Sequence, residues 1–396
     1  MTASTSPDRH WPYWPLLPIY PYGQRQTLRR EIIPDWIWVF EQVQGIFYVV
    51  VPIRMTVIRL EAGGLLVYAP VAPTRECLGL LAELSDRHGP VRYIIQPTVS
   101  GIEHKVFIGP FARRFPQAQV WVAPGQWSFP LNLPLSWLGY PLGRTEILPI
   151  ERAATPFAAE FDYEILGPLG LGLGKFGEVV FYHRRSRTLL VTDTILSVPP
   201  DPPEVIQLNP YPLLFHAKDG PADPITDTPR NRQKGWQRIS LFALYFRPQT
   251  LTTIDLGPAW AAAKGGSDRT PRNYFGLYPF AWQPGWRDTF AHLSQGEKLR
   301  VAPILQTLIL NRQPHQVRTW AQRVALWPFE RIIPCHFAAP LTATPHQWRE
   351  AFQFLDPDHD PLYPPEDLAV LEDIDRSLIA LKITPPPAKG PNLPNP

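Results

Sequence analysis

The sequence predicts an α/β fold arranged as a four-layer αββα sandwich, with a loop-rich insertion and proline-rich ends. Two observations lead to this prediction. Runs of β-branched and aromatic residues alternate with a helical segment between residues 36 and 125, as in strand–helix–strand units. A second set of strands begins near residue 161, and hairpins precede and interrupt the crossover units. This order favours two packed sheets over one doubly wound sheet.

The composition is that of an ordinary globular protein. The chain has 396 residues, of which 44% are hydrophobic and 18% charged, so a sizeable core is expected. A net charge of +3 is too small to indicate nucleic acid or an anionic membrane as a partner. The two cysteines, Cys77 and Cys335, form neither a disulfide framework nor a thiolate metal cluster. We expect a soluble, cytoplasmic protein, without a signal peptide or a transmembrane segment.

The first 35 residues form an arm rich in aromatic residues and prolines. Its rings would be costly to leave in water, so we expect the arm to pack along the domain. A contact with a partner or a membrane surface is the alternative. The aromatic residues of the arm are Trp11, Tyr13, Trp14, Tyr20 and Tyr22.

The main domain is expected to span residues 36–345. Strands are predicted at 35–42, 46–61 and 63–71, followed by a helix at 73–89 that carries leucines on one side and ends at a glycine. A buried strand at 91–98, a short helix at 103–116 and a strand at 118–125 follow. These segments account for the first sheet and its outer helices.

The second half of the domain begins with strands at 161–170 and 177–195, the latter broken by a polar turn near residues 183–187. Residues from about 199 to 287 are predicted to be a loop-rich insertion around one helix at 236–246. Helices at 299–310 and 315–327 and a strand at 329–337 complete the domain. Residues 346–396 form a C-terminal extension, with a disordered proline-rich tail from about residue 384.

Four residues suited to metal binding lie just beyond apolar strands. Glu103 and His104 follow the strand at 91–98, Asp193 ends "TLLVTD", and His336 ends "RIIPCH". Because functional side chains collect at the carboxyl ends of strands in α/β folds, we expect these four to converge. Two imidazoles and two carboxylates would suit a divalent first-row metal ion.

Each of these residues also has a purely structural interpretation. Glu103 and His104 would then be an acid at a helix N-terminus and a hydrogen-bonded core histidine. Asp193 would cap the turn after its strand, and His336 would be a satisfied buried histidine. The interpretations are linked, since a metal at one position requires it at the others.

The motifs resemble those of the metallo-β-lactamase-fold superfamily. That family carries Thr-His-x-His-x-Asp-His after a strand, a middle His within His-x-x-Gly, an Asp closing a strand and a final Pro-Gly-His. Here "TVSGIEH" keeps Thr98 and His104 and has Glu103 in place of the Asp. The bridging Asp corresponds to Asp193, and "PCH" supplies His336.

The departures from this pattern fall on one metal site. In the family, one site uses the first two histidines and the middle one, and here Val99, Gly101 and Gly174 stand at those positions, although Gly177 keeps the motif's glycine. The other site corresponds to positions that all keep a residue able to bind metal. The resemblance therefore implies a degenerate centre with at most one divalent ion, such as zinc, iron or manganese, or with none. The ligands of that centre would be Glu103, His104, Asp193 and His336.

The whole chain also resembles an uncharacterised domain-of-unknown-function family (number 4336) of cyanobacterial and chloroplast proteins. Segments such as "SGIEHKVFIGPFARRFPQAQVWVAPGQW" carry this likeness. It implies a photosynthetic source. It also implies the periphery of photosynthetic membranes as an alternative location. It implies no established activity.

Three functions stay open at this point. A single-metal hydrolase would act on an ester, thioester, lactone or phosphoester through a metal-activated water, with Lys105 and His216 as candidate bases. A non-catalytic assembly or scaffold factor would keep the fold for its surface and bind a protein partner. Two histidines and a carboxylate also suit a mononuclear iron oxidoreductase. The substrate, partners and oligomeric state are not indicated by the sequence.

Overall fold

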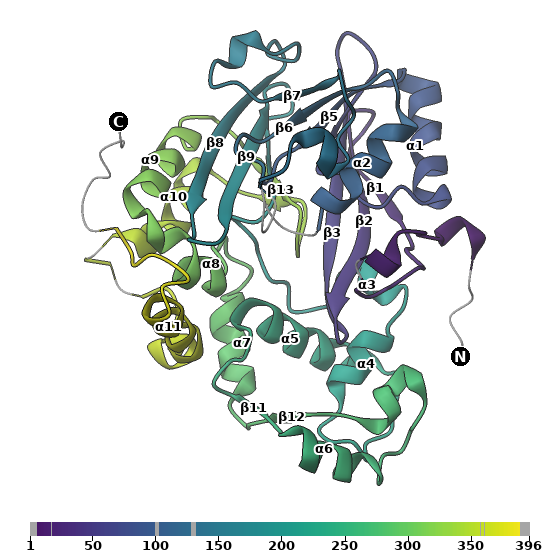
Figure 1. Cartoon of the computed structure of the whole chain (residues 1–396), viewed down its shortest axis with the longest axis vertical. Helices are drawn as coiled ribbons and strands as arrows, with labels where there is room; N and C mark the ends of the chain where they lie inside the picture. The colour runs from purple at the N-terminus through teal and green to yellow at the C-terminus, as the bar shows by residue number, and fades with distance from the viewer. Residues whose placement is uncertain are drawn as a thin grey trace.

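The computed structural model describes residues 6–16, 18–99, 103–127, 132–356, 358–359 and 361–388. Two β-sheets face each other in its upper part (Figure 1). The first sheet has seven strands in sequence order: β1 (Leu28–Ile33), β2 (Ile37–Ile46), β3 (Val49–Arg59), β4 (Leu65–Tyr68), β5 (Val91–Gln96), β6 (Gln119–Val122) and β7 (Thr145–Ile147). The second has five strands in the order β14 (Leu341–Thr342), β13 (Arg331–Pro334), β10 (Thr188–Val191), β9 (Lys175–His183) and β8 (Phe161–Gly170).

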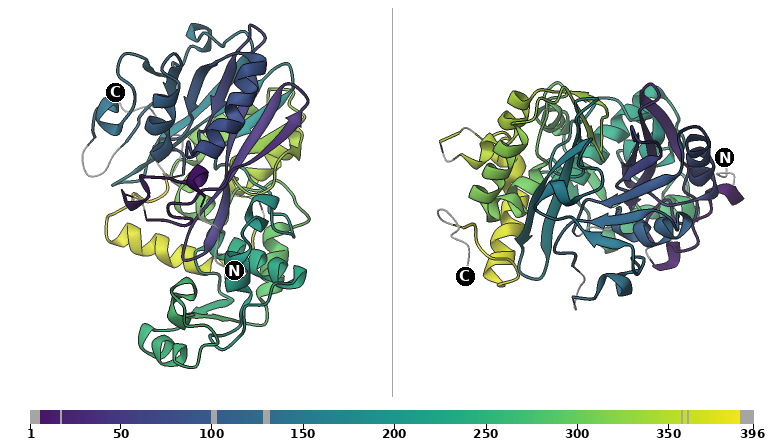
Figure 2. Two further views of the ribbon diagram at one scale, coloured as in Figure 1. Left: turned by 90° about the vertical axis from the view of Figure 1, so that its right-hand side faces the viewer. Right: turned by 90° about the horizontal axis from the view of Figure 1, so that it is seen from above.

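Helices cover the outer face of each sheet. The helices α1 (Arg75–His88) and α2 (Lys105–Arg114) share one apolar cluster with strands of the first sheet. On the far side, α9 (Pro314–Val324) and α10 (Pro345–Ala351) share another with strands of the second sheet. A third cluster lies between the sheets and includes Tyr68 and Phe181. The four layers are visible in the right-hand view of Figure 2 and confirm the predicted αββα class.

Local sequence explains where the elements of the first sheet begin and end. The hydroxyl of Thr74 accepts the Cys77 N–H at 3.2 Å and starts α1, which stops at Gly89, where φ is +97°. The β2–β3 pair is antiparallel over its full length, from Ile37 opposite Ile58 to Ile46 opposite Val49. This long hairpin therefore reaches beyond the sandwich, and Figure 1 shows its tip at the lower lobe.

The insertion is more helical than predicted. Instead of one helix it contains α3 (Glu204–Gln207), α4 (Tyr211–Ala217), α5 (Pro229–Tyr245) and α6 (Leu256–Ala263), and it runs into α7 (Trp286–Ser294). The strands β11 (Leu251–Thr253) and β12 (Phe280–Trp282) form a small separate sheet. The short helices follow prolines or span only one or two turns, so they leave no apolar periodicity to read.

Aromatic side chains fasten the insertion to the hairpin tip. Phe47 stacks on Tyr274 with ring centroids 4.1 Å apart, and Tyr48 packs edge-on against Phe215 at 5.2 Å. The Tyr48 hydroxyl also donates to the Arg272 carbonyl oxygen at 2.8 Å. These contacts make the hairpin part of the insertion's own core.

Both ends of the chain lie against the domain. Trp11 is buried against Phe107 with ring centroids 5.3 Å apart, as expected for a packed arm, while Tyr13 and Trp14 remain exposed. The end of the predicted arm forms the edge strand β1, which pairs with β2. Towards the C-terminus, α8 (Pro303–Leu308) packs against α11 (Pro365–Ala380). The predicted disordered tail is held at least to Ala388, whose N–H donates to the Arg312 carbonyl at 3.0 Å.

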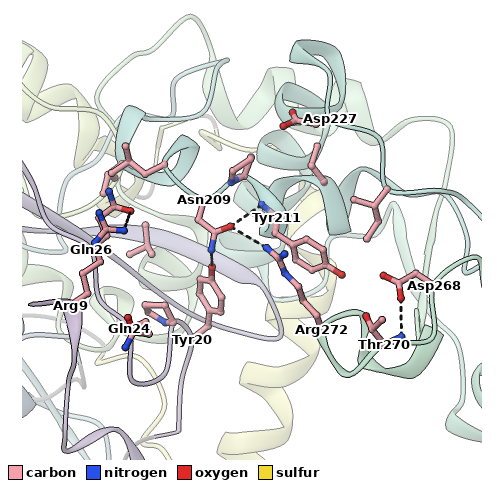
Figure 3. Close-up of a pocket in the computed structure, with 17 residues that line it drawn as sticks. Arg9, Tyr20, Gln24, Gln26, Asn209, Tyr211, Asp227, Asp268, Thr270 and Arg272 are labelled. Carbon is pink, nitrogen blue, oxygen red and sulfur yellow. Dashed lines mark hydrogen bonds between the residues drawn. The ribbon is translucent and has the colours of Figure 1, made fainter. Parts of the chain in front are cut away.

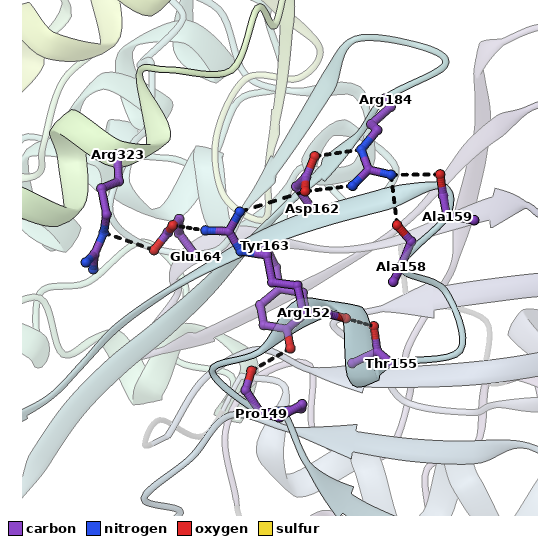
Figure 4. A network of polar contacts seen from close by, with 10 residues as sticks. All are labelled: Pro149, Arg152, Thr155, Ala158, Ala159, Asp162, Tyr163, Glu164, Arg184 and Arg323. Carbon is purple, nitrogen blue, oxygen red and sulfur yellow. Dashed lines mark hydrogen bonds and ion pairs between the residues drawn. The ribbon is translucent and has the colours of Figure 1, made fainter.

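A polar network ties α9 to the second sheet (Figure 4). Glu164 on β8 is almost buried and forms ion pairs with Arg152 and, at 3.2 Å, with Arg323 of α9. Beside it, Asp162 accepts two hydrogen bonds of 2.7 Å from Arg184.

Among the helices of the described residues, none combines the length and the apolar composition that crossing a membrane requires.

Candidate functional site

Three of the four predicted ligands come together at one edge of the sandwich. His104 lies at the N-terminus of α2, just after β5, whereas Asp193 and His336 each follow their strand by two residues. Strands β10 and β13 are parallel, and Val191 is paired with Pro334. Asp193 and His336 each lie two residues beyond one of these paired residues, so their side chains come together. His336 Nε2 lies 3.0 Å from Asp193 Oδ1. The imidazole rings of His104 and His336 have their centroids 6.1 Å apart.

Backbone carbonyls fix how both imidazoles are oriented. His336 Nδ1 donates to the Pro52 oxygen at 2.9 Å, and His104 Nδ1 donates to the Pro70 oxygen at 3.2 Å. Because a carbonyl can only accept, each Nδ1 carries a proton. His104 Nε2 is buried and has no hydrogen-bond partner among the described residues. In neutral His104 this buried nitrogen therefore holds a lone pair that accepts no hydrogen bond from the described residues, and its other nitrogen is anchored, as in a metal-binding histidine.

The charges at the site divide unequally. Burial lowers the pKa of His104 to about 4, helped by the charge of His336, so His104 is neutral at pH 7. Burial opposes charge on Asp193 as well, but the hydrogen bond and charge of His336 bring the Asp193 pKa below its usual value. Burial also lowers the pKa of His336, but the hydrogen bond and the charge of Asp193 raise it above its usual value. Asp193 and His336 therefore form an ion pair beside a neutral imidazole.

Glu103, the fourth predicted ligand, is half-buried in the bend before α2. Its charge contributes to raising the pKa of His336, so it lies within electrostatic reach of the pair. In the part of the chain that is described, no three His, Cys, Asp or Glu side chains are grouped so as to hold an ion as they lie. The four-ligand set therefore stays a prediction.

Hydrocarbon fills the region assigned by resemblance to the lost metal site. Val99 is only 1% exposed, and a Cβ built on Gly177 would lie 2.6 Å from its Cγ2 atom. A Cβ on Gly174 would be in ordinary contact with the Trp127 ring, 3.8 Å away. Gly101 lies outside the described residues. Close packing of Val99 against Gly177 leaves no space for an imidazole there without rearrangement.

Glu178, on β9, is a site residue that the sequence interpretation missed. Its fully buried carboxylate accepts backbone N–H groups from Thr192, Asp193 and Thr194 at 2.6, 3.1 and 2.9 Å. Burial, followed by the charge of Asp193, raises the pKa of Glu178 to about 7, although the three N–H donors oppose the rise. This single side chain shapes the loop that presents Asp193. A lone acid inside the apolar run "GEVVFY" was the available signal.

Arg54, on β3, was also missed, and it holds the loop that carries His336. It is 1% exposed and donates to Glu41 Oε1 at 2.7 Å, to the Phe337 carbonyl at 2.8 Å and to the Pro334 carbonyl. The two carbonyls lie on either side of His336, and Phe337 adopts a φ of +56°. An arginine within the apolar strand "VVVPIRMTVI" was the signal in the sequence.

The two candidate bases have other contacts. Lys105 Nζ donates to the Val99 carbonyl at 2.9 Å and to the Trp127 carbonyl, which joins two loops. His216 is buried in the insertion, where its Nε2 lies 3.1 Å from the Phe47 carbonyl. Cys335 is buried in the core between the sheets. His216 is therefore part of the insertion's packing around the hairpin tip.

The buried neutral imidazole of His104 predicts an acid-sensitive fold. Its pKa in the folded protein is about 4, below the ordinary value of 6.5, so the unfolded chain binds this proton more tightly. The stability that neutral His104 contributes is therefore fully present above pH 6.5 and is lost as the pH falls towards 4. In the metal-free protein this loss amounts to about 3 kcal/mol. Urea unfolding of the parent and of His104→Gln between pH 7.5 and pH 4 measures the contribution. Parallel pH curves for the two proteins would contradict it.

Comparison with known proteins gives a family and a set of structural neighbours. The sequence model of the family described as "Domain of unknown function (DUF4336)" matches residues 34–354. No curated protein matches the sequence significantly. Among solved structures, a metallo-β-lactamase from Pontibacter korlensis is 11% identical, with a TM-score of 0.38, over 83% of this chain and 99% of that one.

A flavodiiron protein from Giardia intestinalis is also 11% identical, with a TM-score of 0.44, over 85% of this chain and 61% of that one. The Flv1 flavodiiron core from Synechocystis sp. PCC6803 has a TM-score of 0.37 at 11% identity, over 84% of this chain and 61% of that one. All three TM-scores are below 0.5, so no activity is carried over from these structures.

Proposed function

We propose that this chain, which belongs to the DUF4336 family, binds one divalent metal ion through His104, Asp193 and His336 and acts as a single-metal hydrolase. The observation that supports this proposal is the buried, unpartnered Nε2 of His104 beside the ion pair of Asp193 and His336. A buried nitrogen lone pair without a donor is costly unless something binds it. A divalent cation would bind it and would also suit the carboxylate of Asp193.

The donor set fits such an ion in its chemistry. His104 and His336 each donate Nδ1–H to a backbone carbonyl, which directs Nε2 away from that carbonyl and fixes the ring. Asp193 is already deprotonated, because its pKa is lowered beside His336. Binding would require His336 to exchange its bond to Asp193 for the ion, with loss of the proton on Nε2. Metal affinity should therefore rise with pH.

The residues around the ligands define what the centre can do. A bound divalent ion supplies an activated water and polarises a substrate oxygen, which suits an ester, thioester, lactone or phosphoester. Glu178 keeps the Asp193 loop in place through three backbone N–H groups. Arg54 does the same for the His336 loop through two carbonyls. Val99 occupies the neighbouring space, so the chemistry is assigned to one ion.

Metal content tests the proposal directly. Protein purified without an affinity-metal step and incubated with zinc, iron and manganese should contain about one ion per chain by plasma mass spectrometry. The double variant His104→Ala, His336→Ala should lose it. His346→Ala is the matched control, because this exposed histidine lies on α10, away from the site, and should keep the ion.

The outcomes distinguish between a hydrolase, an iron oxidoreductase and a non-catalytic scaffold factor. Zinc or manganese lost with the double variant, together with chelator-sensitive hydrolysis of model esters, supports a hydrolase. Iron with an absorption band would instead favour redox chemistry. An absence of metal from the parent under all three incubations would contradict the enzyme proposal. It would favour the non-catalytic assembly or scaffold factor, which binds a protein partner through its surface. Circular dichroism of the double variant must match the parent for the loss to be assigned to the ligands.

A further inference from the structure

Helix α6 of the insertion presents apolar side chains to solvent. Its sequence, LGPAWAAA, contains no charged residue, yet only Ala259 and Ala263 are buried. Leu256 is 65% exposed and Trp260, four residues later on the same side of the helix, is 50% exposed. Figure 1 shows α6 at the lower end of the molecule, away from the two sheets. A helix without charged residues is normally buried, so an exposed one is typical of a surface that contacts a partner or a membrane.

A third apolar side chain, that of Phe275, lies beside this helix. Phe275 is 54% exposed, and it lines a small cleft of about 340 Å³ together with Trp260. The next residue, Gly276, touches the end of α6, since a Cβ built on it would lie 2.8 Å from the Ala263 carbonyl oxygen. The helix and the turn at Phe275 therefore form one continuous apolar surface.

The backbone holds Phe275 outward in an unfavourable conformation. Tyr274 and Phe275 have φ angles of +48° and +58°, in the left-handed region that disfavours residues with a side chain. The Tyr274 ring points inward and stacks on Phe47, with centroids 4.1 Å apart. The buried Asn273 fixes the same turn, because its Nδ2 donates to the Asp268 carbonyl at 2.6 Å. Strain that is retained to present an aromatic ring to solvent points to recognition.

Two exposed cations border the apolar side chains. Lys264 and Arg269 line the cleft with Trp260 and Phe275, and no carboxylate is among the described residues of that lining. Neither cation has an ion pair with a described residue. The nearby Asp268 belongs to another cleft, where it accepts the Thr270 N–H at 2.8 Å (Figure 3). We call Leu256, Trp260, Lys264, Arg269 and Phe275 the α6 surface.

The size and charge of the α6 surface distinguish between its potential occupants. A second copy of the chain would place the same cations against each other across a twofold axis, which is unfavourable. Three half-exposed large side chains present about 300 Å² of apolar area, well below the roughly 800 Å² per partner of a stable protein interface. A lipid surface requires only a few inserted apolar side chains, with cations close to anionic headgroups.

We propose that the α6 surface docks on an anionic lipid bilayer. Leu256, Trp260 and Phe275 enter the interface, and Lys264 and Arg269 lie beside the headgroup phosphates. Tryptophan suits this depth because its ring is apolar and its N–H is polar. The net charge of +3 for the whole chain does not reveal such a local arrangement. This docking goes beyond the hydrolase proposed above and does not require a metal ion.

Vesicle sedimentation with the full-length chain tests the role of charge. The parent should bind vesicles of equal parts phosphatidylcholine and phosphatidylglycerol at least about tenfold more strongly than phosphatidylcholine alone, and high salt should remove the difference. The variant Lys264→Gln, Arg269→Gln should lose this preference. The variant Arg113→Gln, Arg114→Gln removes the same charge from the exposed end of α2 and should keep it. Equal losses in the two variants would overturn the assignment to the α6 surface.

A single fluorescent label tests which residues enter the lipid. Both native cysteines, Cys77 and Cys335, are buried, so a nitrobenzoxadiazole label is directed to the new thiol in Leu256→Cys. Its emission should shift to the blue and brighten when anionic vesicles are added. The same label in Leu326→Cys, at a position that is 81% exposed and outside the α6 surface, should not respond. A response at position 326 without one at position 256 would overturn the proposed orientation.

A tryptophan pair completes the test. Trp260→Ser should weaken vesicle binding about tenfold, because its exposed ring surface no longer enters the interface. Trp137→Ser changes a ring that is 76% exposed in the loop between β6 and β7, and should bind as the parent does. The variant His104→Ala, His336→Ala should also bind normally, which separates docking from the metal centre. No vesicle binding by the parent, or a dimer that is lost in Trp260→Ser, would overturn the proposal.

Discussion

Replacing Glu178 with alanine is expected to lower the free energy of unfolding by about 4 kcal/mol, because three backbone N–H groups lose their acceptor at once. The carboxylate is fully buried, so water cannot easily take its place. The N–H groups belong to Thr192, Asp193 and Thr194, and the expected result therefore includes a loosened Asp193 loop. Chemical denaturation at pH 7.5 measures the loss of stability.

Glu178→Gln separates the role of the acceptor from that of side-chain volume. The amide keeps one carbonyl oxygen for the loop but brings an NH₂ group towards N–H donors, so about half of the alanine effect is expected. Glu61→Ala serves as a control, because Glu61 is exposed and its carboxylate pairs with Arg185 at the surface, for an expected change below about 1 kcal/mol. If Glu178→Ala were as mild as Glu61→Ala, the loop would not depend on this carboxylate.

Arg54→Met is expected to destabilise the fold by about 3–5 kcal/mol, because it removes one of the two guanidinium partners of a buried carboxylate and leaves two buried carbonyls without this donor. The carboxylate is that of Glu41, which is 2% exposed, and the carbonyls belong to Pro334 and Phe337. Methionine keeps most of the apolar volume, so the loss reports on the polar contacts. Urea unfolding and metal affinity by calorimetry would show whether the His336 loop loosens with it.

The surface ion pair of Arg185 with Glu61 again offers a matched comparison. Arg185→Met removes a guanidinium whose side chain is 55% exposed, so its expected effect is below about 1 kcal/mol. Glu41 would keep its bond from Arg30 at 2.9 Å in the Arg54 variant. A double variant Arg54→Met, Glu41→Gln should recover part of the lost stability, because it removes the buried charge as well. No recovery would contradict the assignment of the loss to Glu41.

The layered architecture could be predicted because its elements obey local rules. The helix α1 has a Thr cap and a Gly stop, and β5 and β6 are mostly apolar and mostly buried, as expected for parallel strands inside a sheet. The insertion could not be predicted in the same way. Its short helices are held by contacts with the hairpin tip at Phe47 and Tyr48, more than 150 positions earlier in the sequence than most of their partners. Such contacts leave no periodic trace.

The same distinction applies to the site. His104, Asp193 and His336 could be placed at one edge of the sandwich because each follows an apolar strand. Glu178 and Arg54 lie inside strands and act through backbone groups of distant loops, so their roles depend on a three-dimensional arrangement. A charged residue within an apolar strand was visible in both cases. Its partners were not, because backbone N–H and C=O groups are the same at every position.

The packing of Val99 sets a limit on protein engineering. Histidines introduced at positions 99 and 174 would not by themselves produce a two-metal centre, because Val99 contacts the backbone of β9 at Gly177 and the Trp127 ring adjoins Gly174. At position 99 the imidazole would be inserted into a space already filled by hydrocarbon and would displace it at a cost in stability. A redesign would first have to make room between position 99 and Gly177 on β9. Close packing of Val99 against Gly177 thus works against a second metal site in this scaffold.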